Sequence, residues 1–281
     1  MILIPTDFSE NAWNALNYAV HLFKEEECSF YLLNAYQVFD FPSEILLPMN
    51  PAETRFAIAR QNSEKGLQKL VDELEARNST ARHKFISLSV YDRLLNAVII
   101  TLAEYPLNLI IMGTRGENNH SIREFGSNAV AVMENIKQCP VMAVPQRAPV
   151  FIKGNRKEIV LSSNLKTSYQ EKDFHFLVEL AKLIKAEIKV LHIQEKEELR
   201  PQQLKNKELL EKALEGVNHS FHTLSRVKVA SGIHNFVESR GSDLLAMVHK
   251  KHSLLNSIFN VPLVEQINGK QRVPLLVMPK L

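Results

Sequence analysis

Residues 107–128, LNLIIMGTRGENNHSIREFGSN, join an apolar run to a loop that contains three glycines. Gly113 directly follows the run, Gly116 comes after two further residues and Gly126 after nine more, although the chain of 281 residues contains only nine glycines. The run LNLIIM is typical of a buried strand, and a helical pattern begins at about Gly126. This stretch therefore predicts a strand, a glycine-containing loop and a helix, the unit from which α/β folds are built.

The same alternation of apolar runs and helical patterns extends over the first half of the chain. Strands are expected over residues 1–5, 29–36, 83–90, 107–112 and 141–145, and helices over residues 10–26, 91–104 and 126–137. Ser9 fits the N-cap of the first helix. Such alternation predicts a doubly wound, open parallel sheet, which binds ligands at the carboxyl ends of its strands, where the strand order reverses.

The second half of the chain repeats the plan of the first. MGTRG…QCPVMAVP closes the first half at Pro145, and MVHKKH…RVPLLVMP closes the second at Pro279. LIPTDFS, residues 3–9, likewise corresponds to VLSSNLK, residues 160–166. The repeat predicts two tandem α/β domains, residues 1–148 and 156–281, joined by the segment QRAPVFIKGNR.

Composition argues against several classes of protein. The net charge of +3 comes from 34 basic and 31 acidic residues spread along the chain, which is unlike the clustered basic face of a nucleic-acid binder. No apolar run is long enough for a membrane span, and the N-terminus does not look like a secretory signal, so a cytoplasmic protein is expected. Cys28 and Cys139 have no metal-ligand or CxxC spacing, so reduced, buried thiols are expected.

The glycine loop has the chemistry of an anion site. The helix that starts at Gly126 and Ser127 would direct free backbone N–H groups and the positive end of its dipole into the loop. Phosphates need close approach of the backbone and the turns need positive φ, and glycine meets both needs. The Ser127 hydroxyl would add a donor.

These residues resemble the ATP-binding branch of the universal stress protein family, whose pattern G-x2-G-x9-G-[S/T] follows the fourth strand. Gly113, Gly116, Gly126 and Ser127 match that pattern in type and spacing. PTDFS, residues 5–9, looks like the end of the family's first strand, and CPVMAVP looks like its last. The resemblance covers nearly the whole chain and implies two tandem five-stranded domains of the adenine nucleotide alpha hydrolase-like type.

The resemblance implies an ATP site in the first domain. Asp7 would accept a hydrogen bond from the ribose, Pro5 and Thr6 would line the same pocket, and the backbone of Ala35 would meet the adenine. Asp7 alternatively caps the following helix, and the glycine pattern favours the ribose contact over that interpretation.

The remaining implied contacts surround the glycine loop. Met112 and Gly113 would flank the ribose. Gly116, Gly126 and Ser127 would hold the phosphates, with Asn128 as a further donor. The phosphates would carry any Mg²⁺. Arg115, inside the loop, is either a phosphate ligand or merely solvated, and the sequence leaves both open.

The second domain departs from the pattern. His249 and His252 stand where Gly113 and Gly116 do, and Asn164 replaces Asp7. Pro262 and Leu263 occupy the positions that match Gly126 and Ser127, so a phosphate donor is lost and no nucleotide is expected there. The two histidines lack a visible third ligand, so no metal site is expected either.

The resemblance gives the second domain a structural role. It implies an intrachain pseudo-dimer, often with the last strands paired edge to edge, and the strands VMAVP and LLVMP suit that pairing. A homodimer of whole chains remains open, as does the role of the segment 37–53, either as a lid over the adenine or as a contact with the other domain.

Three functions are compatible with these features. The first is a cytoplasmic, ATP-binding stress-response or signalling protein, in which the nucleotide shifts a conformational population. The second is a slow ATPase, although Glu117, His120 and Glu124 include no assignable base. The third is a nucleotide-free interaction module, against which the retained glycine pattern argues.

Overall fold

The structure is a computed structural model that describes residues 1–38, 51–77, 82–114, 125–149, 157–194, 198–248 and 273–280. None of the helices in these ranges combines the length and hydropathy that crossing a membrane would require.

Strands and helices alternate in both halves of the chain. The first half contains β1 (Ile2–Pro5), α1 (Glu10–Leu22), β2 (Cys28–Tyr36), α2 (Pro51–Arg77), β3 (His83–Tyr91), α3 (Leu94–Glu104), β4 (Leu109–Gly113), α4 (Ser127–Asn135) and β5 (Val141–Val144). The second half contains β6 (Lys157–Ser162), the 3-10 helix η1 (Glu171–Phe174), α5 (His175–Leu183), β7 (Ala186–Gln194), α6 (Pro201–Ala213), β8 (His219–Ser225), α7 (Val229–Arg240), β9 (Leu244–Val248) and β10 (Leu275–Met278).

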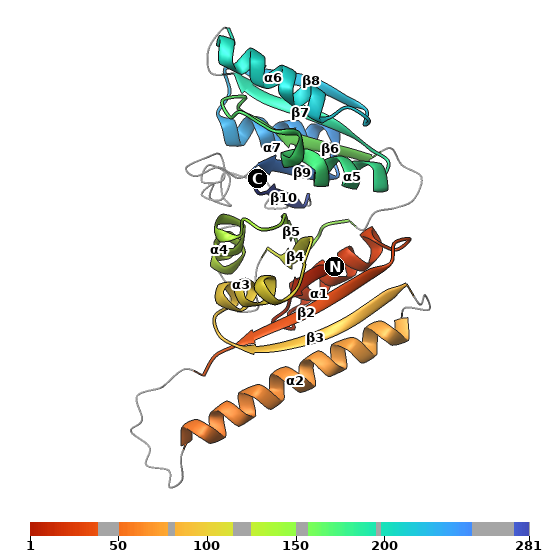
Figure 1. Ribbon diagram of the computed structural model, residues 1–281, viewed down its shortest axis with the longest axis vertical. Helices are drawn as coiled ribbons and strands as arrows, with labels where there is room; N and C mark the ends of the chain where they lie inside the picture. Colours follow the sequence, from red (N-terminus) through yellow and green to blue (C-terminus); the bar gives the residue numbers. More distant parts are fainter. Residues whose placement is uncertain are drawn as a thin grey trace.

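The ten strands form one sheet in the order β3-β2-β1-β4-β5-β10-β9-β6-β7-β8. Every neighbouring pair within a half is parallel, and the two halves meet where β5 and β10 pair antiparallel, with Leu276 opposite Met142. Figure 1 shows this junction in the middle of an elongated molecule, with α2 and α6 near its two ends. The expected fold, two tandem doubly wound parallel sheets of five strands each, is confirmed.

Each face of the sheet carries its own apolar core, because successive side chains of a strand point to opposite faces. In β1, Ile2 and Ile4 belong to the core that includes Leu16 of α1 and Leu67 of α2. Leu3, between them, belongs to the other core, with Val98 of α3 and Val132 of α4. Helices therefore cover both faces of the sheet, so a ligand site is expected at the carboxyl ends of the strands.

Helix α2 is the main element that the sequence pattern missed. Its 27 residues follow a segment whose residues 39–50 lie outside the described ranges. Both roles considered for residues 37–53, a lid over the adenine or a contact with the other domain, therefore stay predictions. From its middle to its carboxyl end the helix is anchored by the buried side chains of Ser63, Leu67, Leu70 and Leu74. The apolar spacing therefore covers only part of a long, largely polar helix.

Both cysteines are free thiols. Cys139 is buried as expected, and burial raises the pKa of its thiol to about 12. Cys28 is only half-buried, because the first residue of β2 lies at the margin of the core, so the expectation of two buried thiols is wrong for that residue.

Candidate functional site

The strand order reverses at the carboxyl ends of β1 and β4, which is where a ligand-binding crevice is expected in such a sheet. From β1 the chain continues to β2 on one side, whereas β4 lies on the other side. The parallel register pairs Ile2 with Leu109 and Leu3 with Ile110, so continuing it brings Thr6 level with Gly113. The two segments that the sequence selected therefore end side by side at one edge of the sheet.

A tight turn follows β1 and fixes the position of Asp7. The Thr6 N–H donates to the Leu33 carbonyl oxygen (2.8 Å), and the Phe8 N–H donates to Thr6 Oγ1 (3.0 Å). The Ser9 N–H donates to Asp7 Oδ1 (3.1 Å). The side chain of Asp7 is exposed at this edge.

Ser9, and not Asp7, caps helix α1. Its hydroxyl accepts a hydrogen bond from the Ala12 N–H (3.2 Å), and its backbone has extended dihedral angles, as an N-cap residue requires. The expected cap is confirmed. The alternative in which Asp7 caps this helix is wrong, because the Asp7 carboxylate supports the turn that precedes the cap.

Asn34 is a member of this site that the sequence did not indicate. Its side-chain amide is buried and donates to the Thr6 carbonyl oxygen (2.8 Å), which ties the end of β1 to β2. No local signal reveals such a contact, since the two residues are 28 positions apart. Ala35 follows it at the end of β2 and is half-buried.

Thr114 connects the end of β4 to helix α4. Its N–H donates to the Val144 carbonyl oxygen of β5 (3.2 Å), and its carbonyl oxygen accepts from the Gly126 N–H (2.7 Å). The amino end of α4 is thereby held against the carboxyl end of β4, as the glycine pattern predicts. Thr114 is buried, and the sequence pattern passed over it.

The role expected for the Gly126 N–H is wrong. That group already donates to Thr114, so the donors left at the helix start include the N–H groups of Ser127 and Asn128, which an α-helix does not satisfy internally. The first acceptor within the helix is the Gly126 carbonyl oxygen, to which the Val130 N–H donates (3.1 Å). The side chains of Ser127 and Asn128 are exposed at this position.

The expectation that the glycines have positive φ is also wrong for Gly113 and Gly126, the two glycines of the pattern that lie in the described residues. Gly126 has φ −68° and ψ 159°, a conformation open to any residue, and Gly113 is not among the glycines with positive φ. Gly113 is needed for space, because a Cβ there would lie 2.9 Å from Asn11 Nδ2 and 3.1 Å from the Asn11 carbonyl oxygen. Helix α1 therefore packs directly on the end of β4.

Other predicted residues have mixed outcomes. Pro5 is buried, and Met112 is only 5% exposed and packs in a core, so its backbone rather than its side chain is available to a ligand. Arg115 and Gly116 lie outside the described residues, as do His249, His252, Pro262 and Leu263. In the described part of the chain, no three histidine, cysteine or acidic side chains are arranged to hold a metal ion.

The second half repeats the turn almost bond for bond. The Ser163 N–H donates to the Leu191 carbonyl oxygen (3.0 Å), the Leu165 N–H to Ser163 Oγ (3.1 Å) and the Lys166 N–H to Asn164 Oδ1 (2.9 Å). Phe8 and Leu165 even share a left-handed backbone, with φ of 64° and 55°. Asn164 is thus the structural counterpart of Asp7.

The second turn is covered, whereas the first is open. Asn206 of α6 is fully buried and donates to the Leu165 carbonyl oxygen (2.8 Å), and Gln203 donates to the Asn164 carbonyl oxygen (3.1 Å). Leu165 is consequently 1% exposed, but its counterpart Phe8 is 43% exposed. Among the described residues, the turn after β6 is therefore covered, whereas the equivalent turn after β1 is exposed.

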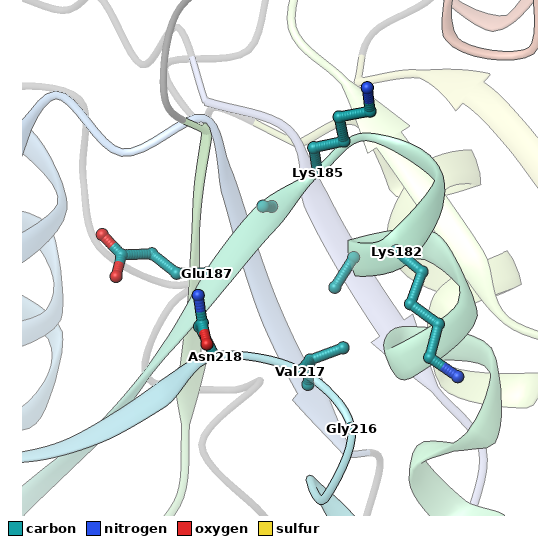
Figure 2. Close-up of a pocket in the computed structure, with 8 residues that line it drawn as sticks. Lys182, Lys185, Glu187, Gly216, Val217 and Asn218 are labelled. Atoms are coloured by element: carbon teal, nitrogen blue, oxygen red, sulfur yellow. The ribbon is translucent and has the colours of Figure 1, made fainter.

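A surface hollow of about 420 Å³ lies elsewhere, near the amino end of β7. Its lining includes Lys182, Lys185, Glu187, Gly216, Val217 and Asn218. Figure 2 shows the ammonium groups of the two lysines pointing in opposite directions, and Lys182 is paired with Glu179 (2.9 Å). The hollow thus has no converging charges and lies at the amino end of its strand, in the other half of the chain from β1 and β4.

The universal stress protein family model matches residues 1–145, which is more than half of the chain. The chain belongs to the universal stress protein family. Its tandem form is shared by solved structures, since a universal stress protein from Archaeoglobus fulgidus has a TM-score of 0.68 at 18% identity, with 99% of this chain and 96% of that chain covered.

Two Pseudomonas aeruginosa structures are similar to this universal stress protein over the same length. One is a functionally unknown protein, with a TM-score of 0.61, and the other is a putative universal stress protein, with a TM-score of 0.59. Both are 12% identical, with 99% of this chain and 92% of theirs covered. At such identities the likeness shows the fold alone. No curated protein sequence matches the chain significantly.

Proposed function

We propose that this universal stress protein binds ATP, or a related adenine nucleotide, at the open crevice between β1 and β4, and acts as a stress-response or signalling module. One observation carries the proposal. Among the described residues, the exposed side chains of Asp7, Ser127 and Asn128 lie at the ends of two adjacent strands, where the turn after β1 is exposed and its counterpart in the second half is covered.

The chemistry of these groups fits a nucleotide. The first-turn N–H groups of Ser127 and Asn128, together with the Ser127 hydroxyl, are donors at the positive end of a helix and suit phosphate oxygens. The Asp7 carboxylate is an acceptor and suits the ribose hydroxyls. The backbone at Ala35, one strand further, suits the adenine edge, and Mg²⁺ would be carried by the phosphates.

A signalling role requires binding and no catalysis. A ligand that binds one conformation better than another shifts the population toward it, and a partner then recognises the surface that changes. The side chains considered for hydrolysis, Glu117, His120 and Glu124, lie outside the described residues, so a slow ATPase stays a prediction.

The test is to purify the protein without added nucleotide, denature it and identify the released small molecules by chromatography and mass spectrometry. About one ATP or ADP per chain is expected for the wild type, and none for Gly126→Val, which places a branched side chain where the phosphate approaches. Asn135→Val, at the exposed far end of the same helix, is the matched control and should retain the nucleotide.

Titration calorimetry with ATP and Mg²⁺ completes the test. The backbone angles of Gly126 are open to any residue, so the variant should fold, which its unfolding curve would verify. A wild-type protein that releases nothing and binds nothing would reject the proposal and leave the nucleotide-free interaction module. Two nucleotides per chain would show that the covered second half also binds.

A further inference from the structure

Strands β2 and β3 extend beyond the floor of the crevice. Strand β1 ends at Pro5, paired with Leu33, whereas β2 and β3 remain paired as far as Tyr36 and Tyr91. Three further residues at about 3.3 Å each raise this pair roughly 10 Å above the end of β1. The overhang forms a wall beside the crevice, on the side away from β4.

Three aromatic rings gather on this wall. Phe56 of α2 meets Tyr91 edge to face, with ring centroids 5.0 Å apart. Tyr36 lies 5.6 Å from Tyr91 and 6.3 Å from Phe56. Tyr91 is 51% exposed and Phe56 is 38% exposed, so the cluster of Tyr36, Phe56 and Tyr91 presents aromatic surface that the protein core does not use.

The second half of the chain shows that the fold does not require these rings. Tyr36 and Tyr91 are the terminal pair of β2 and β3, and the terminal pair of β7 and β8 is Gln194 and Ser225. The second half, in which the turn after β6 is covered, thus has polar residues at the positions where the first half has tyrosines. The pairing of the strands by itself therefore does not explain the rings.

The position of the rings matches the base of a nucleotide. Adjacent strands are about 4.8 Å apart, so β2 and β3 lie roughly 10 and 14 Å from β4, where the phosphates would bind. A nucleotide with its ribose at Asp7, above β1, directs its base over β2 and β3. Exposed aromatic rings stack on nucleobases, because every base has an apolar π-face.

We propose that Tyr36, Phe56 and Tyr91 form the stacking surface for the base of the nucleotide bound in the first half, and so determine the preference for a nucleotide over a bare polyphosphate. This inference rests on the proposed function.

The experiment replaces the two tyrosines of the first half by the residues at the equivalent positions of the second half. Tyr36→Gln with Tyr91→Ser is compared with the wild type by calorimetry, using ATP and inorganic tripolyphosphate as probes, each with Mg²⁺. The double variant should bind ATP about tenfold more weakly and tripolyphosphate equally well, because only the stacking is lost. Gly126→Val should weaken the binding of both probes.

Further variants make the result specific. Phe56→Gln removes the third ring, which comes from helix α2, and should also weaken the binding of ATP. This variant tests the inference even if the double variant fails to fold. Ile58→Gln, at a more exposed apolar position of the same helix, should change neither affinity. Unchanged ATP affinity in the folded double variant or in Phe56→Gln would overturn the stacking surface and leave the proposed function intact. A wild-type protein that binds no ATP would overturn both.

Discussion

The side chains of Asp7 and Asn164 occupy the same position in two equivalent turns. Both accept a hydrogen bond from the backbone N–H two residues later, at 3.1 and 2.9 Å. The turn itself therefore needs an acceptor and not a charge. Since either side chain forms it, the turn does not account for the negative charge of Asp7.

Asp7→Asn separates the turn from the proposed ribose contact. Because Asn164 forms the same turn naturally, the free energy of unfolding should stay within about 0.5 kcal/mol of the wild type. ATP affinity should fall about tenfold, since an amide replaces a charged acceptor. Calorimetry and urea denaturation measure the two quantities.

The reverse substitution, Asn164→Asp, is the matched control. It restores the carboxylate in the covered second turn, where Gln203 and Asn206 lie over the backbone, so no second nucleotide should bind. Equal ATP affinity in Asp7→Asn and the wild type would argue against the ribose contact.

At the scale of elements, the two halves use their helices differently over the same sheet edge. Helix α6 covers its turn with Gln203 and Asn206, whereas Gly66 of α2 makes room for the ring of Phe8. A Cβ at Gly66 would lie 2.5 Å from Phe8 Cζ. A glycine of α2 thus faces the exposed turn after β1, and two amide side chains of α6 lie over the covered turn after β6.

A charged contact joins α7 to β6. Arg240 donates to both carboxylate oxygens of Glu158, at 2.8 and 2.6 Å, and the Ser242 hydroxyl donates as well, at 2.7 Å. Burial by itself would raise the pKa of Glu158, but the hydrogen bonds from Arg240 and Ser242 outweigh it, and the pKa is lowered from its ordinary value of 4.5. The folded state therefore prefers the ionised carboxylate.

Glu158→Gln tests this contact through its pH dependence. The stabilisation from ionised Glu158 is present above pH 4.5 and is lost as the pH falls through the lowered pKa. At pH 7 the variant should be less stable by about 1 kcal/mol, after allowance for solvent screening. The difference should shrink below pH 4.5 in urea unfolding measured over a pH series.

Glu238→Gln, an exposed position on α7, is the control for the loss of one negative charge. A difference between Glu158→Gln and the wild type that stays constant down to pH 3 would show that ionisation of Glu158 is not its source.

At the scale of the whole molecule, the two halves share one sheet. Leu276 of β10 and Met142 of β5 face each other across the antiparallel junction, and both are fully buried. Each half thereby covers one edge strand of the other half. This cover is needed because an exposed apolar edge strand tends to pair with other chains. The second half has this structural role whether or not it binds a ligand.

Leu276→Asp should break the junction. A carboxylate at this fully buried position has no partner, so the free energy of unfolding should fall by about 4 kcal/mol or more. Denaturant unfolding measures the loss, and size-exclusion chromatography reports exposed edges as self-association.

Leu204→Asp introduces the same charge at an exposed position of α6 and should cost less than about 0.5 kcal/mol. Equal stabilities of the two variants would contradict a dry, closely packed junction between β5 and β10.

The five strands of the first half, three of its four helices, the tandem repeat, the parallel sheet and the Ser9 cap could be predicted from the sequence, because they follow from periodicity and capping over a few neighbouring residues. Three contacts became known only from the folded chain: the hydrogen bond from the Gly126 N–H to Thr114, the contact of Asn34 with Thr6 and the cover that Asn206 provides over Leu165. Those contacts join residues between 12 and 41 positions apart, and no local pattern encodes which distant backbone group a side chain or amide will meet. The open edge of the first half is likewise a property of packing, because the two turns have nearly the same local hydrogen bonds and differ in what lies above them.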